Sequence, residues 1–183
     1  MNYRIFYFIF LFFVVSFACF ELKIFHSDKY NGILIIGNKN NKLFYEENDI
    51  DVFMDPKILK VDYIGELKTI LTKHVSPRDS VNKDAEVYIR LFFNPETLNV
   101  EEVYFLYRNI SPEKVFTPVQ MESIEHDLKE TIIANKNVKW INLREIDRQF
   151  KGAKYVNHMI GFKVYQLFSF KKGDFAYDKI WIL

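Results

Sequence analysis

The stretch AEVYIRLFFNPETLNVEEVYFLYRN, residues 85–109, decides the fold of this chain. Two apolar, aromatic runs flank the polar tetrapeptide Asn94-Pro95-Glu96-Thr97. Apolar residues recur at every second position in both runs, which is the period of a strand with two different faces. The pattern therefore predicts an antiparallel hairpin that turns at residues 94–97.

The two faces of this hairpin differ in composition. One face is apolar and is expected in the core; it carries Ala85, Val87, Ile89, Leu91, Phe93, Val103, Phe105 and Tyr107. The other face mixes charged residues with Tyr88, Phe92, Tyr104 and Leu106. These four residues are either covered by the rest of the chain or form an exposed aromatic patch. We therefore take them as the candidate interaction surface.

Two segments have the period of amphipathic helices. Apolar residues recur at three- and four-residue spacing over residues 58–74, which predicts one helix there. The second helix is predicted over residues 118–133, where Thr117 is the N-cap, Pro118 the first helical residue and Gln120 the third. An antiparallel sheet with two amphipathic helices packed on one face is the predicted architecture, which belongs to the α+β class.

The flanking segments add shorter predicted strands. The run Ile33–Ile36 is expected to form a hairpin with Leu43–Tyr45, and residues 138–140 to begin another strand. Residues 160–170 read as a long strand or a hairpin, and the apolar tail 180–183 as a strand at a sheet edge. Residues 19–57 are a β-rich segment that either joins the α+β domain of residues 58–183 or forms a small subdomain.

Residues 1–18 have the organisation of an export signal. Arg4 is followed by the unbroken apolar stretch 5–15, and Ser16-Phe17-Ala18 places small residues at −3 and −1 of a signal-peptidase site. Cys19, the only cysteine, follows directly and is a candidate for lipidation. A lipid-anchored protein and a soluble secreted one both stay open, in the periplasm or elsewhere in the cell envelope.

Composition and charge exclude several classes of partner. The chain has 183 residues, of which 49% are hydrophobic and 27% charged, as in globular proteins. Without residues 1–18, 24 basic residues balance 24 acidic ones. Nucleic-acid binding needs concentrated positive charge, so we expect no nucleic-acid partner. Contact with a membrane is expected only through a lipid on Cys19.

No group of residues has the spacing of a catalytic, cofactor or metal site. Glu122 and His126 lie four residues apart on the predicted second helix, but a zinc site needs three or four ligands. The acidic residues between Glu46 and Asp55 lack the pattern of a calcium loop. We therefore nominate no catalytic residue, metal or cofactor, and the sequence favours a protein without enzymatic activity.

The element order over residues 58–170 resembles the C-terminal domain of TonB and its relatives. The resemblance is carried by the helix, the hairpin with its second strand NVEEVYFLYR, the second helix and the strand region after it. The turn differs, since that family has Gly where Asn94-Pro95-Glu96-Thr97 stands here. The resemblance implies recognition of another envelope protein by pairing of a sheet edge with an extended peptide. The chain is also similar to small exported proteins of Bacteroides-type bacteria, which bears on localisation only.

Two other functions stay open on the sequence. The first is a carrier of a small ligand in an aromatic-lined pocket, for which Tyr104, Tyr107, Trp140 and Tyr165 are the candidates. The second is a hydrolase whose site has no sequence pattern.

Overall fold

The structure is a computed structural model that describes residues 25–30, 32–42, 59–75, 83–134, 136–141, 155–170 and 181–182. In this part of the chain, six strands form one antiparallel sheet in the order β1-β2-β5-β4-β7-β8, and β3 pairs with β6 in a second sheet. The strands are β1 (Phe25–Tyr30), β2 (Ile33–Asn38), β3 (Leu59–Val61), β4 (Glu86–Phe93), β5 (Val100–Arg108), β6 (Val138–Trp140), β7 (Val156–Lys163) and β8 (Trp181–Ile182). The helices are α2 (Ile64–His74), the 3-10 turn η2 (Pro112–Lys114), α3 (Pro118–Thr131) and α5 (Val164–Phe170).

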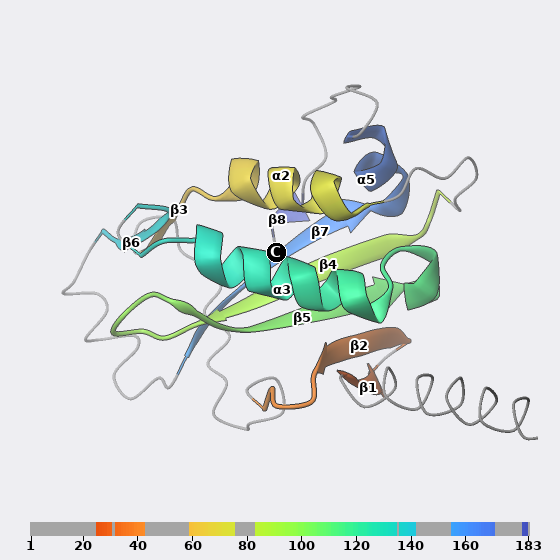
Figure 1. The fold of residues 1–183 in the computed structure, drawn as a ribbon, viewed down its shortest axis with the longest axis horizontal. Helices are drawn as coiled ribbons and strands as arrows, with labels where there is room; N and C mark the ends of the chain where they lie inside the picture. Colours follow the sequence, from red (N-terminus) through yellow and green to blue (C-terminus); the bar gives the residue numbers. More distant parts are fainter. Residues whose placement is uncertain are drawn as a thin grey trace, which may run out of the picture.

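The predicted α+β architecture is confirmed. Figure 1 shows α2, α3 and α5 on the same side of the large sheet. The main core lies between these helices and the sheet, where residues such as Leu67 of α2, Ile124 of α3 and Phe105 of β5 are fully buried. Burial of this apolar face is the largest stabilising contribution that the described residues make. No helix in the described ranges has the length and apolarity to cross a membrane.

The central hairpin forms as predicted. β4 and β5 pair with Tyr88 opposite Leu106 and Arg90 opposite Tyr104, so both predicted faces are correct. The Asn94 side chain begins the turn by accepting hydrogen bonds from the backbone N–H groups of Glu96 and Thr97. Leu98 has a φ of 58°, and the register shifts between Phe92 and Phe93. A bulge at Glu101 of β5 and the left-handed residue Leu98 both belong to the closure of this longer loop.

α3 begins as its sequence predicts. The Thr117 side chain accepts from the Gln120 backbone N–H, and the Gln120 side chain accepts from the Thr117 N–H. This capping box satisfies two backbone donors that the first helical turn would otherwise leave without a partner.

The predicted hairpin between Ile33–Ile36 and Leu43–Tyr45 is wrong. β2 pairs with β1 on one side, across a turn that contains Gly32, and with β5 on the other. Both edges of β2 are therefore occupied by these two strands, and residues 43–45 lie outside the described residues. Gly32 has a φ of 81°, which glycine adopts without strain and which this tight turn requires.

Two further boundaries differ from the predictions. Residues 59–61 form β3 and the helix begins only at Ile64, since β3 pairs with β6. Residues 164–170 are the helix α5 and not a strand. Val164 and Leu167, three positions apart, are both buried, and the Gln166 side chain accepts from the Lys163 backbone N–H at the start of the helix. The tail prediction is confirmed, because Trp181 and Ile182 pair with β7 at the sheet edge.

Candidate functional site

The four candidate residues of the interaction surface lie together on the sheet face that α2 and α3 leave uncovered. Cross-strand pairing places Tyr88 opposite Leu106, and the rings of Phe92 and Tyr104 meet edge to face at 5.5 Å. Phe92 and Tyr104 are fully buried, Leu106 is buried and Tyr88 is half-buried. Together with Ile35 and Tyr155 they form a second, smaller core, so in this conformation they are not an exposed patch.

Two Glu-Val-Tyr sequences shape this face. In each, the tyrosine hydroxyl donates to the glutamate two residues before it: Tyr88 to Glu86 at 2.7 Å and Tyr104 to Glu102 at 2.9 Å. Each ring also lies over a glycine of the neighbouring strand. A Cβ on Gly37 would come within 2.6 Å of the Tyr104 ring, and one on Gly161 within 2.7 Å of the Tyr88 ring. An aromatic ring therefore covers the glycine backbone on both sides of the hairpin.

The carboxylate of Glu86 is the centre of an ion-pair group at one end of this face. Its oxygens lie 2.6 Å from Lys163 Nζ and 3.6 Å from Arg108 Nη1. Burial would raise the pKa of Glu86, but the hydrogen bonds from Lys163 and Tyr88 outweigh it and lower the pKa. The group is internally satisfied and holds β4, β5 and β7 in register.

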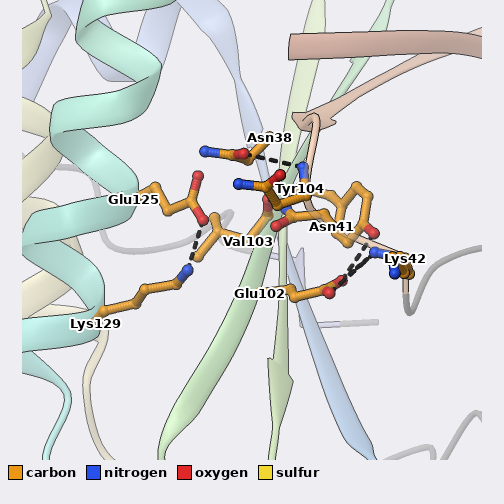
Figure 2. Close-up of polar contacts among 9 residues, drawn as sticks. Asn38, Asn41, Lys42, Glu102, Val103, Tyr104, Glu125 and Lys129 are labelled. Carbon is orange, nitrogen blue, oxygen red and sulfur yellow. Dashed lines mark hydrogen bonds and ion pairs between the residues drawn. The ribbon is translucent and has the colours of Figure 1, made fainter. Parts of the chain in front are cut away.

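A second polar group fixes the N-terminal hairpin to β5, as Figure 2 shows. β2 separates from β5 after Gly37, and the buried Asn41 side chain then donates to the Val103 carbonyl at 2.9 Å. The Lys42 backbone N–H donates to both oxygens of Glu102, at 2.9 and 3.0 Å. Asn41 therefore takes the place of the next residue of β2 and caps that part of the β5 edge.

Glu125 is a buried acid on α3. Its side chain is 7% exposed, and one oxygen lies 2.7 Å from Lys129 Nζ. The other oxygen, Oε2, is buried and has no hydrogen-bond partner. Burial raises the pKa of Glu125, although Lys129 opposes the shift. Its spacing from Met121 and Leu128 places it on the buried stripe, and this signal could have been read from the sequence.

A groove with a volume of about 640 Å³ lies between α2 and α3. Its lining consists of Gly65, Glu66, Thr69, Ile70, Lys73, Asp127 and Thr131. Asp127 accepts from Lys73 at 2.7 Å and contacts His74 at 2.9 Å, and these two hydrogen bonds lower the pKa of its carboxyl group. The lining contains no aromatic residue, so this groove is not the aromatic-lined pocket that a small-ligand carrier was expected to have.

His158 and Tyr63 form a buried polar pair that the sequence did not indicate. The Tyr63 hydroxyl is hydrogen-bonded to His158 Nδ1, which joins β7 to the residue before α2. Burial lowers the pKa of His158 to about 4 and raises that of Tyr63 well above its ordinary value. At neutral pH the tyrosine is therefore the donor and the neutral histidine the acceptor.

The other residues named from the sequence do not assemble into a site. Cys19 and the acidic residues between Glu46 and Asp55 lie outside the described residues. Glu122 and His126 are both exposed on α3. Tyr104 and Tyr107 lie on opposite faces of the sheet and Tyr165 is exposed on α5, whereas Trp140 donates to the Pro95 carbonyl. Within the described ranges, no three His, Cys, Asp or Glu residues are placed to hold a metal ion.

The remaining feature is the outer edge of β1, which with β8 is one of the two strands that end the large sheet in the described part of the chain. This six-residue strand ends the large sheet, and β2 is the only described strand that pairs with it. Among the described residues, no second strand pairs with the backbone N–H and C=O groups on its outer side.

Comparisons with known proteins assign no activity to these features. No family model matches the chain, and no curated protein does. Among solved structures, it is similar to a DUF5043 family protein from Bacteroides uniformis, with 18% identity and a TM-score of 0.47. The similarity covers 76% of this chain and 90% of that one. The neighbour is thus a protein of a Bacteroides species, whereas the resemblance to TonB is not shown.

Proposed function

We propose that this chain is a non-enzymatic protein-binding module of the bacterial cell envelope. Residues 1–18 would direct its export, with Cys19 as the first residue of the mature chain. The mature domain would bind an extended segment of another envelope protein along β1. The observation that supports this proposal best is the open edge of β1 at the end of the sheet.

The described part of the sheet favours β1 over the neighbouring edge of β5. Where β2 separates from β5, the Asn41 side chain donates a hydrogen bond to the Val103 carbonyl, and the Lys42 backbone N–H donates one to the Glu102 carboxylate. A peptide could pair there only by displacing both contacts. At β1 no such cap is present among the described residues, so an incoming strand would form main-chain hydrogen bonds without breaking any that these residues make.

The test is an affinity capture from a bacterial envelope extract. The bait is the mature chain from Cys19 onward with Cys19→Ser, which retains all described residues, and its folding is checked by circular dichroism. We expect capture of a specific envelope protein, and its loss in a Ser27→Pro bait, since proline lacks the N–H that an added strand needs. Capture that Ser27→Pro leaves intact would place the binding site elsewhere, and a folded bait that captures nothing would refute the proposal.

A further inference from the structure

We infer that the groove between α2 and α3 binds an aliphatic diamine, with one ammonium group at Glu66 and the other at Asp127. Figure 1 shows the two helices side by side over the sheet. The volume of the groove, about 640 Å³, is in the range of small-ligand sites. This inference is independent of the proposed function, because no residue that lines the groove belongs to β1.

The groove presents carboxylate oxygens that the described residues do not use. Glu66 accepts from the Asn137 side chain at Oε1, and no described residue donates to its Oε2. Asp127 is bonded to Lys73 and His74 through Oδ2, and no described residue donates to its Oδ1. A carboxylate accepts at both oxygens, so each of these two side chains has room for another donor.

A hydroxyl group in the same groove is also unused. Thr69 and Thr72 of α2 and Ser123 of α3 each donate to the carbonyl group four residues earlier in their own helix. The Thr131 side chain lines the groove, yet its hydroxyl makes no hydrogen bond with the described part of the chain. It is therefore free to accept from an ammonium group.

The two carboxylates lie at opposite ends of the groove. Asp127 is level with Lys73, whose Nζ is 2.7 Å from its carboxylate, and Lys73 follows Glu66 by seven residues on α2. Seven residues of helix rise by about 10.5 Å. The buried, apolar Ile70 lines the groove between these ends. An acceptor at each end with an apolar middle fits two ammonium groups that are joined by about four or five carbons and donate at ordinary distances.

The charge of the lining favours a cation over an anion. Two of the lining residues are acidic and one, Lys73, is basic. The Lys73 side chain is 65% exposed, so water and salt screen its repulsion of an ammonium group at Asp127. An anionic ligand would meet two carboxylates and only one cationic group, which is already paired.

The experiment is isothermal titration calorimetry of the mature chain with Cys19→Ser, at low ionic strength, where ion pairs are least screened. The probes are 1,5-diaminopentane, pentylamine and 1,5-pentanediol, which share one carbon chain and differ in their ammonium groups. We expect diaminopentane to bind with a Kd below about 1 mM, pentylamine to bind about fivefold more weakly and pentanediol not to bind. Equal binding of pentylamine would indicate a site for one ammonium group, such as a lysine side chain, and would overturn the two-ended arrangement.

Substitutions at the two carboxylates locate the binding. Glu66→Gln and Asp127→Asn keep the shape of each side chain and one acceptor oxygen, and each should raise the Kd of diaminopentane about fivefold. Glu122→Gln is the matched control, since this acid is exposed on α3 outside the groove, and it should bind as the wild type does. Lys73→Gln should bind equally well or more tightly, because it removes a like charge. An affinity that neither Glu66→Gln nor Asp127→Asn changes overturns the site.

Gly65 allows the groove to be blocked without loss of the fold. A Cβ at this position would meet no atom within 4 Å, and the residue lies in the first turn of α2. Gly65→Leu should fill the groove and abolish diamine binding, while thermal stability stays the same or rises because leucine favours a helix more than glycine does. A wild-type chain that binds no diamine up to about 10 mM, or a Gly65→Leu chain that binds it normally, overturns the inference. Neither result bears on strand addition at β1.

Discussion

At the scale of single residues, the buried pair of His158 and Tyr63 makes the stability of the fold depend on pH. Neither side chain has access to water, and the hydrogen bond between them exists only while Nδ1 of the histidine is unprotonated. A charged imidazolium at this position could no longer accept at Nδ1 and would be buried against the Tyr63 ring and its hydroxyl group.

We expect His158 to destabilise the fold in acid. Its folded-state pKa of about 4 lies below the ordinary value of 6.5, so the unfolded chain binds the proton more strongly. Stability is then fully present above about pH 6.5 and is lost as the pH falls toward 4, by about 3 kcal/mol at most. Urea unfolding at several pH values measures this loss.

The variant His158→Asn isolates the contribution of this group, since the asparagine oxygen can accept from Tyr63 but does not titrate. Its stability should fall less steeply than that of the wild type between pH 6.5 and 4. The exposed His126→Asn is the matched control and should keep the wild-type profile. Parallel profiles for His158→Asn and wild type would rule out the buried pair as the cause.

Glu125 is the second residue whose burial has a measurable consequence. Only one of its oxygens is paired, so the carboxylate keeps much of its desolvation cost. We expect Glu125→Met to leave stability unchanged or raise it by about 1–2 kcal/mol, because a buried ion pair is often replaceable by an apolar residue. Thermal unfolding against the exposed Glu122→Met checks this, and a loss above about 1 kcal/mol for Glu125→Met would show that the acid is needed.

At the scale of elements, the contact between glycine and tyrosine joins the central hairpin to its neighbours. The Tyr104 ring is fully buried, so it cannot move away from a Cβ at position 37. Tyr88 is only half-buried and has more freedom over Gly161. The two sites have the same local geometry and differ in how far the ring can move.

We therefore expect Gly37→Ala to cost about 1–3 kcal/mol of stability and Gly161→Ala clearly less. Chemical denaturation of both variants measures the difference. In a double-mutant cycle, Gly37→Ala should cost little once Tyr104→Ala has removed the ring. Equal costs at the two glycines would mean that the burial of the ring does not decide the effect.

The buried stripe of α3 is the second element-scale feature with a direct test. Ile124 is fully buried against the sheet, so Ile124→Asp should unfold the domain by placing a charge in the core. Val119, on the same helix, is 55% exposed, and Val119→Asp should change stability by less than about 0.5 kcal/mol. Circular dichroism and thermal melting distinguish the two; an Ile124→Asp variant that melts like the parent contradicts this helix face.

At the scale of the whole molecule, the prediction that remains to be tested is export. Expressed from residue 1 in a bacterial host, the chain should lose residues 1–18, because residues 16–18 match the pattern of a signal-peptidase site. Intact-mass measurement of the purified protein decides this, and an added mass on Cys19 would identify a lipid anchor. A protein that retains its leader would be evidence against export.

The sequence by itself determined the features that depend on near neighbours. The alternation in residues 85–109 determined both faces of the hairpin, and the residues from Thr117 to Gln120 determined where α3 begins. Such signals need only residues two to four positions apart, which backbone geometry brings together in any strand or helix. The position of Glu125 on the buried stripe was available from the same spacing.

Only the tertiary structure decided which elements meet. The partners of β2 lie on both sides of it, and β5 joins it from about 70 residues away in the sequence. Tyr63 and His158 are 95 positions apart, and neither residue has a local pattern that indicates the other. Pairing over such distances depends on the competition of all strands and helices for the same apolar surface. That competition has no local signal, and it placed β1 and β8 at the two ends of the described sheet.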